Sequence, residues 1–134
     1  MNILLDSHVL LWALTDDARL SQKARDHIMD PDNFIFYSAA SVWELSVKHT
    51  LYPESVVFTA EELIRFCDEA GFDALDVSVE HVLLLDTLKR PEDAPRHKDP
   101  FDRILIAQAK AEGMLFLTHD ALLLYYNEKC IIPV

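Results

Sequence analysis

Four acidic residues stand out because each lies in a stretch of hydrophobic sequence: Asp6, Glu44, Asp102 and Asp120. Their settings are "ILLDSHVLLW", "SVWELSV", "DPFDRILIA" and "LFLTHDALLLYY". Carboxylates that meet repel one another, and a divalent cation removes that repulsion. The ligands would all be oxygen, with no paired Cys or His at zinc spacing, so Mg²⁺ or Mn²⁺ is the matching ion. Such a site can activate water and stabilise charge on a phosphodiester.

Each of these acids also has a simpler structural interpretation. Asp6 and Asp120 are good caps for the helices that follow them. Glu44 is one turn before Lys48 and is a natural surface partner for it. Asp102 has the position of the third residue of a capped helix. These interpretations explain the acids singly, but they do not explain why four positions of this kind are all acidic.

The elements that position these acids follow from hydrophobic patterning. Apolar runs predict buried strands over 2–5, 33–38, 73–77, 114–118 and 130–134. Helical patterns fall over 21–30, 38–51, 59–71, 78–89, 99–113 and 120–129. This alternation predicts a single α/β domain, residues 1–134, with a parallel sheet covered on both faces. Neither glycine belongs to a GxGxxG or GxxxxGK[ST] loop, which disfavours the nucleotide-binding versions of this architecture.

Ligands of open α/β sheets bind beyond the carboxyl ends of the strands. Asp6 directly follows the first predicted strand, and Asp120 follows the fourth. Asp102 falls in the first turn of the helix that leads into the fourth strand, and Glu44 in the second turn after the second strand. All four acids converge at this edge if the first and fourth strands are neighbours, an adjacency that the spacing alone leaves open.

A basic cluster lies just before Asp102, formed by Arg96, His97 and Lys98, with Arg103 directly after it. These side chains are candidates for contacts to substrate phosphates. The alternative is a solvated loop, with Arg103 paired to a local acid. Trp12 and Trp43 are most simply core residues, and Trp12 is also a candidate for a partner-binding groove.

The overall charge restricts how the chain can meet nucleic acid. Twelve basic and 23 acidic residues give a net charge of −11. This argues against binding by phosphate neutralisation alone, although a bound metal reverses the local sign of an acidic site.

Two cysteines outside any CxxC pattern favour a reducing compartment. The first apolar run follows no basic segment and is interrupted early by Asp6, so we do not expect a signal peptide. No apolar run approaches the ~20 residues of a membrane span, so we expect a cytoplasmic protein without membrane association.

The chain resembles a PIN-domain ribonuclease, and specifically a VapC-type toxin of a type II toxin–antitoxin system. The matching stretches are "LLDSHVLLW", "SAASVWELSVK", "HKDPFDRILIAQA" and "LTHD", in the family's order. The resemblance implies five parallel strands in the order 3-2-1-4-5. It also implies Mg²⁺ or Mn²⁺ bound by catalytic acids at the positions of Asp6, Glu44, Asp102 and Asp120. Ser7 and Thr118 fall where the family places supporting hydroxyls, and Asp99 belongs to the motif with a less defined role. The chain departs from its relatives by lacking a glycine in "KHTLYPES".

In function, the resemblance implies a metal-dependent endoribonuclease that cleaves RNA with metal-activated water and leaves a 5′-phosphate and a 3′-hydroxyl. It further implies a cognate antitoxin, a homodimer, and contact with operator DNA only through the antitoxin. Competing interpretations are a phosphatase or DNA nuclease with the same acidic site, a receiver-like signalling domain, and an inactive regulatory module that binds a partner. The intact set of four acids counts against the inactive module.

Overall fold

Five parallel strands form the centre of the computed structural model, which describes residues 1–134. The strands are β1 (Asn2–Leu5), β2 (Phe34–Ser38), β3 (Asp73–Leu75), β4 (Leu115–Thr118) and β5 (Ile131–Pro133). Their order in the sheet is β3-β2-β1-β4-β5, and Leu5 of β1 pairs with Leu117 of β4. The predicted α/β class is confirmed, as is the strand order implied by the family resemblance. The first and fourth strands are neighbours, as convergence of the acids requires.

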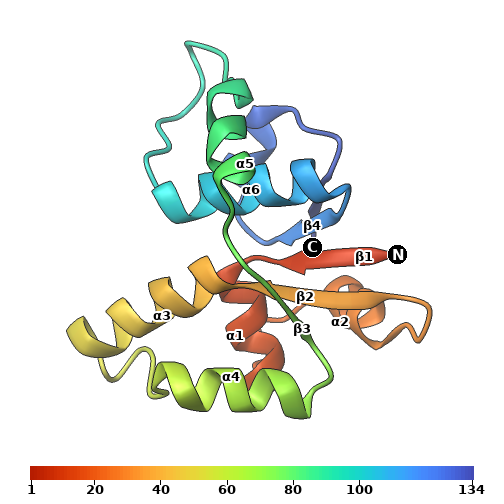
Figure 1. Ribbon diagram of the computed structural model, residues 1–134, viewed down its shortest axis with the longest axis vertical. Helices are drawn as coiled ribbons and strands as arrows, with labels where there is room; N and C mark the ends of the chain where they lie inside the picture. The colour runs from red at the N-terminus through yellow and green to blue at the C-terminus, as the bar shows by residue number, and fades with distance from the viewer.

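Helices cover both faces of this sheet. The α-helices are α1 (Ser7–Thr15), α2 (Gln22–Met29), α3 (Ala39–Leu51), α4 (Ala60–Glu69), α5 (Val79–Leu83) and α6 (Pro100–Glu112). Figure 1 shows α5 and α6 on one side of the sheet, with α1, α2 and α4 on the other. Ile3 and Leu5 enter one hydrophobic cluster while Leu4 enters the other, because successive strand side chains point to opposite faces.

Local capping sets the bounds of α6, the longest helix on its face. Asp99 caps it by accepting a hydrogen bond from the Phe101 N–H (2.9 Å), and Pro100 is its first residue. Gly113 ends it in the left-handed conformation (φ 66°), which costs a glycine little. The predicted helix over 99–113 is therefore confirmed. Its first turn, which carries Asp102, lies at the edge of the sheet where β1 ends (Figure 1).

Two predicted helices are shorter and tighter than their patterns indicated. The segment predicted as a helix over 78–89 forms α5 and then a 3₁₀ helix, η1 (Leu84–Thr87). The segment predicted as a helix over 120–129 forms a 3₁₀ helix, η2 (Ala121–Tyr126). A 3₁₀ helix rises about 2.0 Å per residue against about 1.5 Å in an α-helix. The short η2 segment therefore covers more of the distance back to β5 than an α-helix of equal length.

Candidate active site at the carboxyl edge of the sheet

Asp6 is the first residue after β1, and its carboxylate is fully engaged. Oδ1 accepts hydrogen bonds from the N–H groups of His8 (2.8 Å) and Val9 (3.0 Å), so Asp6 caps α1. Oδ2 accepts a hydrogen bond from the Thr118 hydroxyl at 2.6 Å. Asp6 therefore does cap α1, as its simpler structural interpretation predicted. Capping occupies only one of its oxygens, however, and the other is held by the neighbouring strand.

Glu44 lies in the second turn of α3 and is buried, with 4% of its surface exposed. Its Oε2 pairs with Lys48 Nζ at 2.8 Å, one turn along the helix. Its Oε1 is buried without any hydrogen-bond partner. The expected Glu44–Lys48 pair therefore exists, but it is not the solvated surface pair that the spacing suggests. One carboxylate oxygen is left for a ligand.

Asp102 joins a chain of buried polar groups. His97 Nε2 lies 3.1 Å from Asp102 Oδ2, and His97 Nδ1 lies 2.8 Å from the Tyr126 hydroxyl. When Asp102 is ionised, Nε2–H donates to the carboxylate, so Nδ1 accepts from the tyrosine hydroxyl. Burial lowers the pKa of His97, which favours this neutral imidazole. Asp102 is thereby held in place from the loop before α6 and from η2.

Asp120 is the second residue after β4 and caps η2. Its N–H donates to the Thr118 hydroxyl oxygen at 3.1 Å, and its Oδ1 accepts from the Leu122 N–H at 2.9 Å. One ligand atom from each of Asp120, Asp102 and His97 falls within 4.8 Å of the others. Thr118 hydrogen-bonds to both Asp6 and Asp120, so one hydroxyl links the two strand-end acids.

The other three acids of this edge act electrostatically on Asp102. Burial raises the pKa of Asp102 to about 8, and the negative charges of Asp99, Asp6, Glu44 and Asp120 add to the rise. Burial also raises the pKa of Asp6, against the lowering effect of the Thr118 hydrogen bond. Without a counter-charge, Asp102 therefore retains its proton at a pH where a carboxyl group in ordinary solution is ionised.

The remaining predicted residues divide into supporting and peripheral groups. Ser7 is buried and its hydroxyl donates to the Ser41 hydroxyl (2.9 Å), which ties α1 to α3 beside Asp6. Asp99 caps α6 and adds its charge to the field at Asp102. Arg96 and Lys98 are exposed on the loop before α6. They make no hydrogen bond or ion pair within the protein.

Of the expected phosphate contacts, His97 does not agree with the structure, and Arg103 is partly engaged within the protein. Both ring nitrogens of His97 are hydrogen-bonded to other side chains, and only 4% of its side chain is exposed. The Arg103 guanidinium donates to the Leu85 carbonyl (3.0 Å) and lies over the Tyr126 ring. His97 is therefore not free to contact a phosphate, whereas the Arg103 guanidinium uses one of its five N–H donors on Leu85 and stays a candidate for such a contact. His97 instead supports Asp102.

No pattern in the sequence indicated that Tyr126 or Ser41 belongs to this edge. Tyr126 lies in the apolar run "ALLLYY", and its hydroxyl meets His97 only because η2 folds back over the loop before α6. Of the two tryptophans, Trp12 is buried, whereas Trp43 is 65% exposed and packs edge-on against Phe101 (5.0 Å between ring centres). Only Trp43 presents a large apolar surface.

Comparison with known proteins identifies the family. The family model described as the PIN domain matches residues 3–128, so the chain belongs to the PIN-domain family. No curated protein matches the chain significantly by sequence.

Solved structures with the same fold include two toxin–antitoxin complexes. The structure of VapBC2 from Rickettsia felis bound to a promoter DNA fragment matches with a TM-score of 0.68 and 15% identity, covering 100% of this chain and 98% of that one. VapBC-1 from nontypeable Haemophilus influenzae matches with a TM-score of 0.63 and 14% identity, covering 95% and 92%. At this identity the likeness concerns the fold. None of the helices has the length and apolar character needed to cross a membrane.

Proposed function

We propose that this protein is a metal-dependent endoribonuclease that acts as the toxin of a toxin–antitoxin pair. The observation that carries the proposal is that Asp6, Glu44 and Asp120 lie near enough to Asp102 in a PIN-domain fold to raise its pKa, with one buried oxygen of Glu44 unpartnered. Membership of the PIN-domain family and the similarity in fold to VapBC structures support it.

The donor set fits a magnesium or manganese ion. It consists of carboxylate oxygens, one of them without a partner, and their mutual repulsion calls for a positive counter-charge. Asp6, Glu44, Asp102 and Asp120 would hold the ion. When bound there, the cation would lower the pKa of a water molecule and stabilise negative charge on a phosphodiester.

The chain's own residues prepare this edge for such chemistry. Thr118 fixes the Asp6 carboxylate, Lys48 fixes one oxygen of Glu44, and the His97–Tyr126 pair fixes Asp102. Hydrolysis forms a bond between the water oxygen and phosphorus and breaks the bond to the 3′ oxygen. A carboxylate at the edge takes the water proton, and the leaving oxygen gains one, which leaves a 5′-phosphate and a 3′-hydroxyl.

The partners follow from the same proposal. Two of the solved structures with a similar fold are VapBC complexes, one of them with promoter DNA, which supports a cognate antitoxin for this chain. A net charge of −11 gives this chain little affinity for DNA by itself, so operator DNA would be contacted only through the antitoxin. The exposed Trp43 surface is available for protein contacts, including those of a homodimer. Action on cellular RNA places the protein in the cytoplasm.

A cleavage assay tests the proposed activity directly. The purified chain is mixed with single-stranded RNA, structured RNA and DNA of the same sequence, with EDTA or with millimolar Mg²⁺ or Mn²⁺. We expect cut RNA with 5′-phosphate ends only when metal is present, and no cleavage by Asp120→Asn. Asp68→Asn, which removes an exposed carboxylate from α4, should cleave normally. Metal-dependent cleavage of DNA alone, or cleavage that persists in Asp120→Asn, would contradict the proposal.

A further inference from the structure

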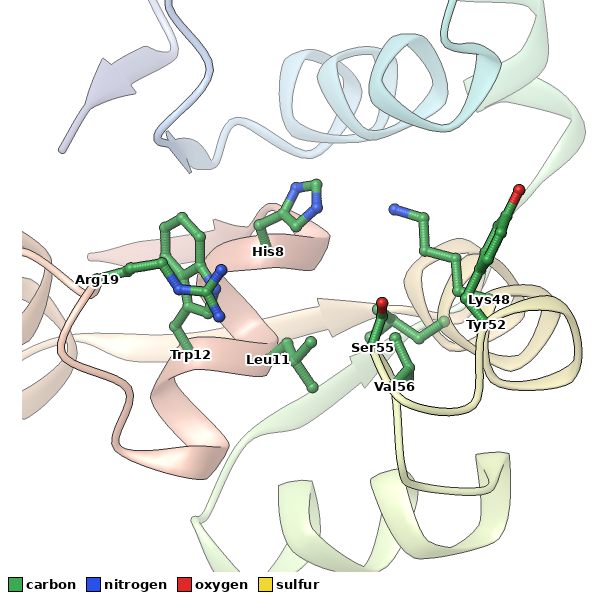
Figure 2. A pocket seen from close by; sticks show the side chains of 9 residues that line it. His8, Leu11, Trp12, Arg19, Lys48, Tyr52, Ser55 and Val56 are labelled. Carbon is green, nitrogen blue, oxygen red and sulfur yellow. The ribbon is translucent and has the colours of Figure 1, made fainter.

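A pocket of about 290 Å³ lies beside the acidic edge, between α1 and the C-terminal part of α3 with the turn that follows it. Figure 2 shows Arg19 and Trp12 at one end of the pocket, Lys48 and Tyr52 at the other, and His8 between the two groups. Its volume is close to the lower end of the range of about 300–1,000 Å³ usual for small-ligand sites. The proposed function does not use this pocket.

The polar lining of the pocket is basic, in a chain whose net charge is −11. Arg19 and Lys48 line it together with His8, and no carboxylate is among the lining residues. The cations have partners outside it, Asp17 for Arg19 and Glu44 for Lys48, but their side chains remain 69% and 35% exposed. In Figure 2 the Lys48 ammonium points toward the His8 ring across the pocket. This arrangement suits an anion that enters between them.

The pocket and the acidic edge share Lys48. Lys48 Nζ lies 2.8 Å from Glu44 Oε2, so the same side chain borders both the pocket and the acids. His8 follows Asp6 by two residues, and its backbone N–H donates to the Asp6 carboxylate. A polymer whose phosphate reaches the four acids therefore has its adjoining residue at the mouth of this pocket.

Aromatic surface accompanies the basic groups. Tyr52 is 60% exposed at the end of the pocket beyond Lys48. His8 packs on Trp12, with ring centres 5.9 Å apart, and the Arg19 guanidinium lies over the same indole at 5.2 Å. Cationic groups next to exposed aromatic rings are the usual elements of a single-strand nucleic-acid site, because every base has a face that can stack.

We propose that this pocket binds the nucleotide of single-stranded RNA that adjoins the scissile phosphate, with its phosphodiester between His8 and Lys48 and its base against Tyr52. The inference rests on the proposed ribonuclease function and specifies how the substrate is held. A protein segment fits this pocket less well than RNA does. An apolar segment would find a better match in the groove beside Trp43, eight of whose nine lining residues are hydrophobic.

Binding of RNA by an inactive variant tests the inference separately from catalysis. Fluorescence anisotropy of a labelled single-stranded RNA oligonucleotide is measured with full-length Asp120→Asn protein, alone and combined with Tyr52→Ala. We expect Tyr52→Ala to weaken binding by about tenfold, because it removes one stacking contact with a base. Tyr52→Trp should retain the affinity, because tryptophan can stack in the same way. Tyr125→Ala, which removes another half-exposed tyrosine on η2, should leave the dissociation constant unchanged.

The salt dependence of RNA binding tests the proposed phosphate contact of Lys48. Lys48→Gln should reduce the slope of log affinity against log salt by about 0.7, the value for one phosphate contact on a single strand. Lys129→Gln, an exposed lysine near the C-terminus, should not change that slope. Melting curves establish that each variant is folded.

Cleavage kinetics are then measured in the active chain, which keeps Asp120. Tyr52→Ala should raise KM for RNA about tenfold with kcat within twofold of the parent. Equal dissociation constants for Tyr52→Ala and Tyr125→Ala would overturn the inference, even if the chain cleaves RNA as proposed. A pocket that serves a protein partner instead of RNA would give that result. Failure of the parent chain to cleave RNA, with Tyr52-dependent RNA binding intact, would count against the proposed activity and not against the pocket.

Discussion

The Thr118 hydroxyl donates to Asp6 Oδ2 at 2.6 Å, across 112 residues of sequence. The same hydroxyl oxygen accepts the Asp120 N–H, so it connects the acids that follow the two central strands. The contact exists because β1 and β4 are neighbours in parallel register, with Leu5 opposite Leu117. A small hydroxyl at the end of β4 therefore orients a carboxylate at the end of β1.

Thr118→Val should destabilise the protein without changing its shape, because valine matches threonine in size but cannot donate to Asp6. A buried carboxylate oxygen left unpaired costs about 1–3 kcal/mol in the free energy of unfolding. Urea denaturation measures the loss. Thr50→Val, which removes an exposed hydroxyl bonded within α3, should change stability by less than about 0.5 kcal/mol. Equal effects of the two substitutions would mean that the Thr118–Asp6 hydrogen bond does not contribute measurably to the free energy of unfolding.

Asp6→Asn should abolish RNA cleavage and leave the fold intact. Asparagine retains an oxygen that can cap α1 but lacks the charge that a divalent cation requires. Circular dichroism checks the fold, and the metal-dependent cleavage assay checks the activity. If Asp6 serves only as a helix cap, the variant will cleave RNA at nearly the rate of the parent.

His97 should act as a positioning residue for Asp102. Groups that hold a metal-binding carboxylate typically contribute about 10–100-fold in metal affinity or activity. We therefore expect His97→Phe to shift the Mn²⁺ activation curve to higher concentration by a factor in that range. Tyr126→Phe, which removes only the hydrogen bond to His97 Nδ1, should shift it less. Unchanged Mn²⁺ dependence in His97→Phe, with only a lower melting temperature, would indicate a purely structural role.

The metal-free protein should lose stability as the pH rises from about 4 to about 8. Burial and neighbouring charges raise the pKa of Asp102 from 3.8 to about 8 in the folded chain. Between these values the folded state binds more protons than the unfolded state, so its stability falls with increasing pH. Melting temperatures in EDTA across this range measure the slope. Asp102→Asn should flatten it, whereas Asp68→Asn should leave it as it is.

Metal binding should offset that loss. A ligand that binds only the folded state stabilises it by about 2.7 kcal/mol at 100 times its dissociation constant. Millimolar Mn²⁺ should therefore raise the melting temperature of the parent at pH 8, and Glu44→Gln should reduce the rise. A melting curve that is the same in EDTA and in Mn²⁺ would rule out a preformed site of four carboxylates.

Local patterns in the sequence determined the fold class of this protein and the bounds of some of its helices. The alternation of apolar strands with helical patterns defined the α/β class, and Asp99, Pro100 and Gly113 set the bounds of α6. Both depend on contacts between residues close in sequence, whose spacing can be read directly. The placement of the four acids at strand or helix ends also followed from position alone.

Only the tertiary structure decided what these residues touch. Glu44 and Lys48 have the spacing of a surface pair, yet α3 turns Glu44 inward and leaves one of its oxygens without a partner. The sequence predicted His97 as part of a basic loop that contacts phosphates, but η2 brings the Tyr126 hydroxyl to its ring from 29 residues away. Such outcomes depend on strand order and on helix packing. They involve residues far apart in the chain, and no local spacing encodes them.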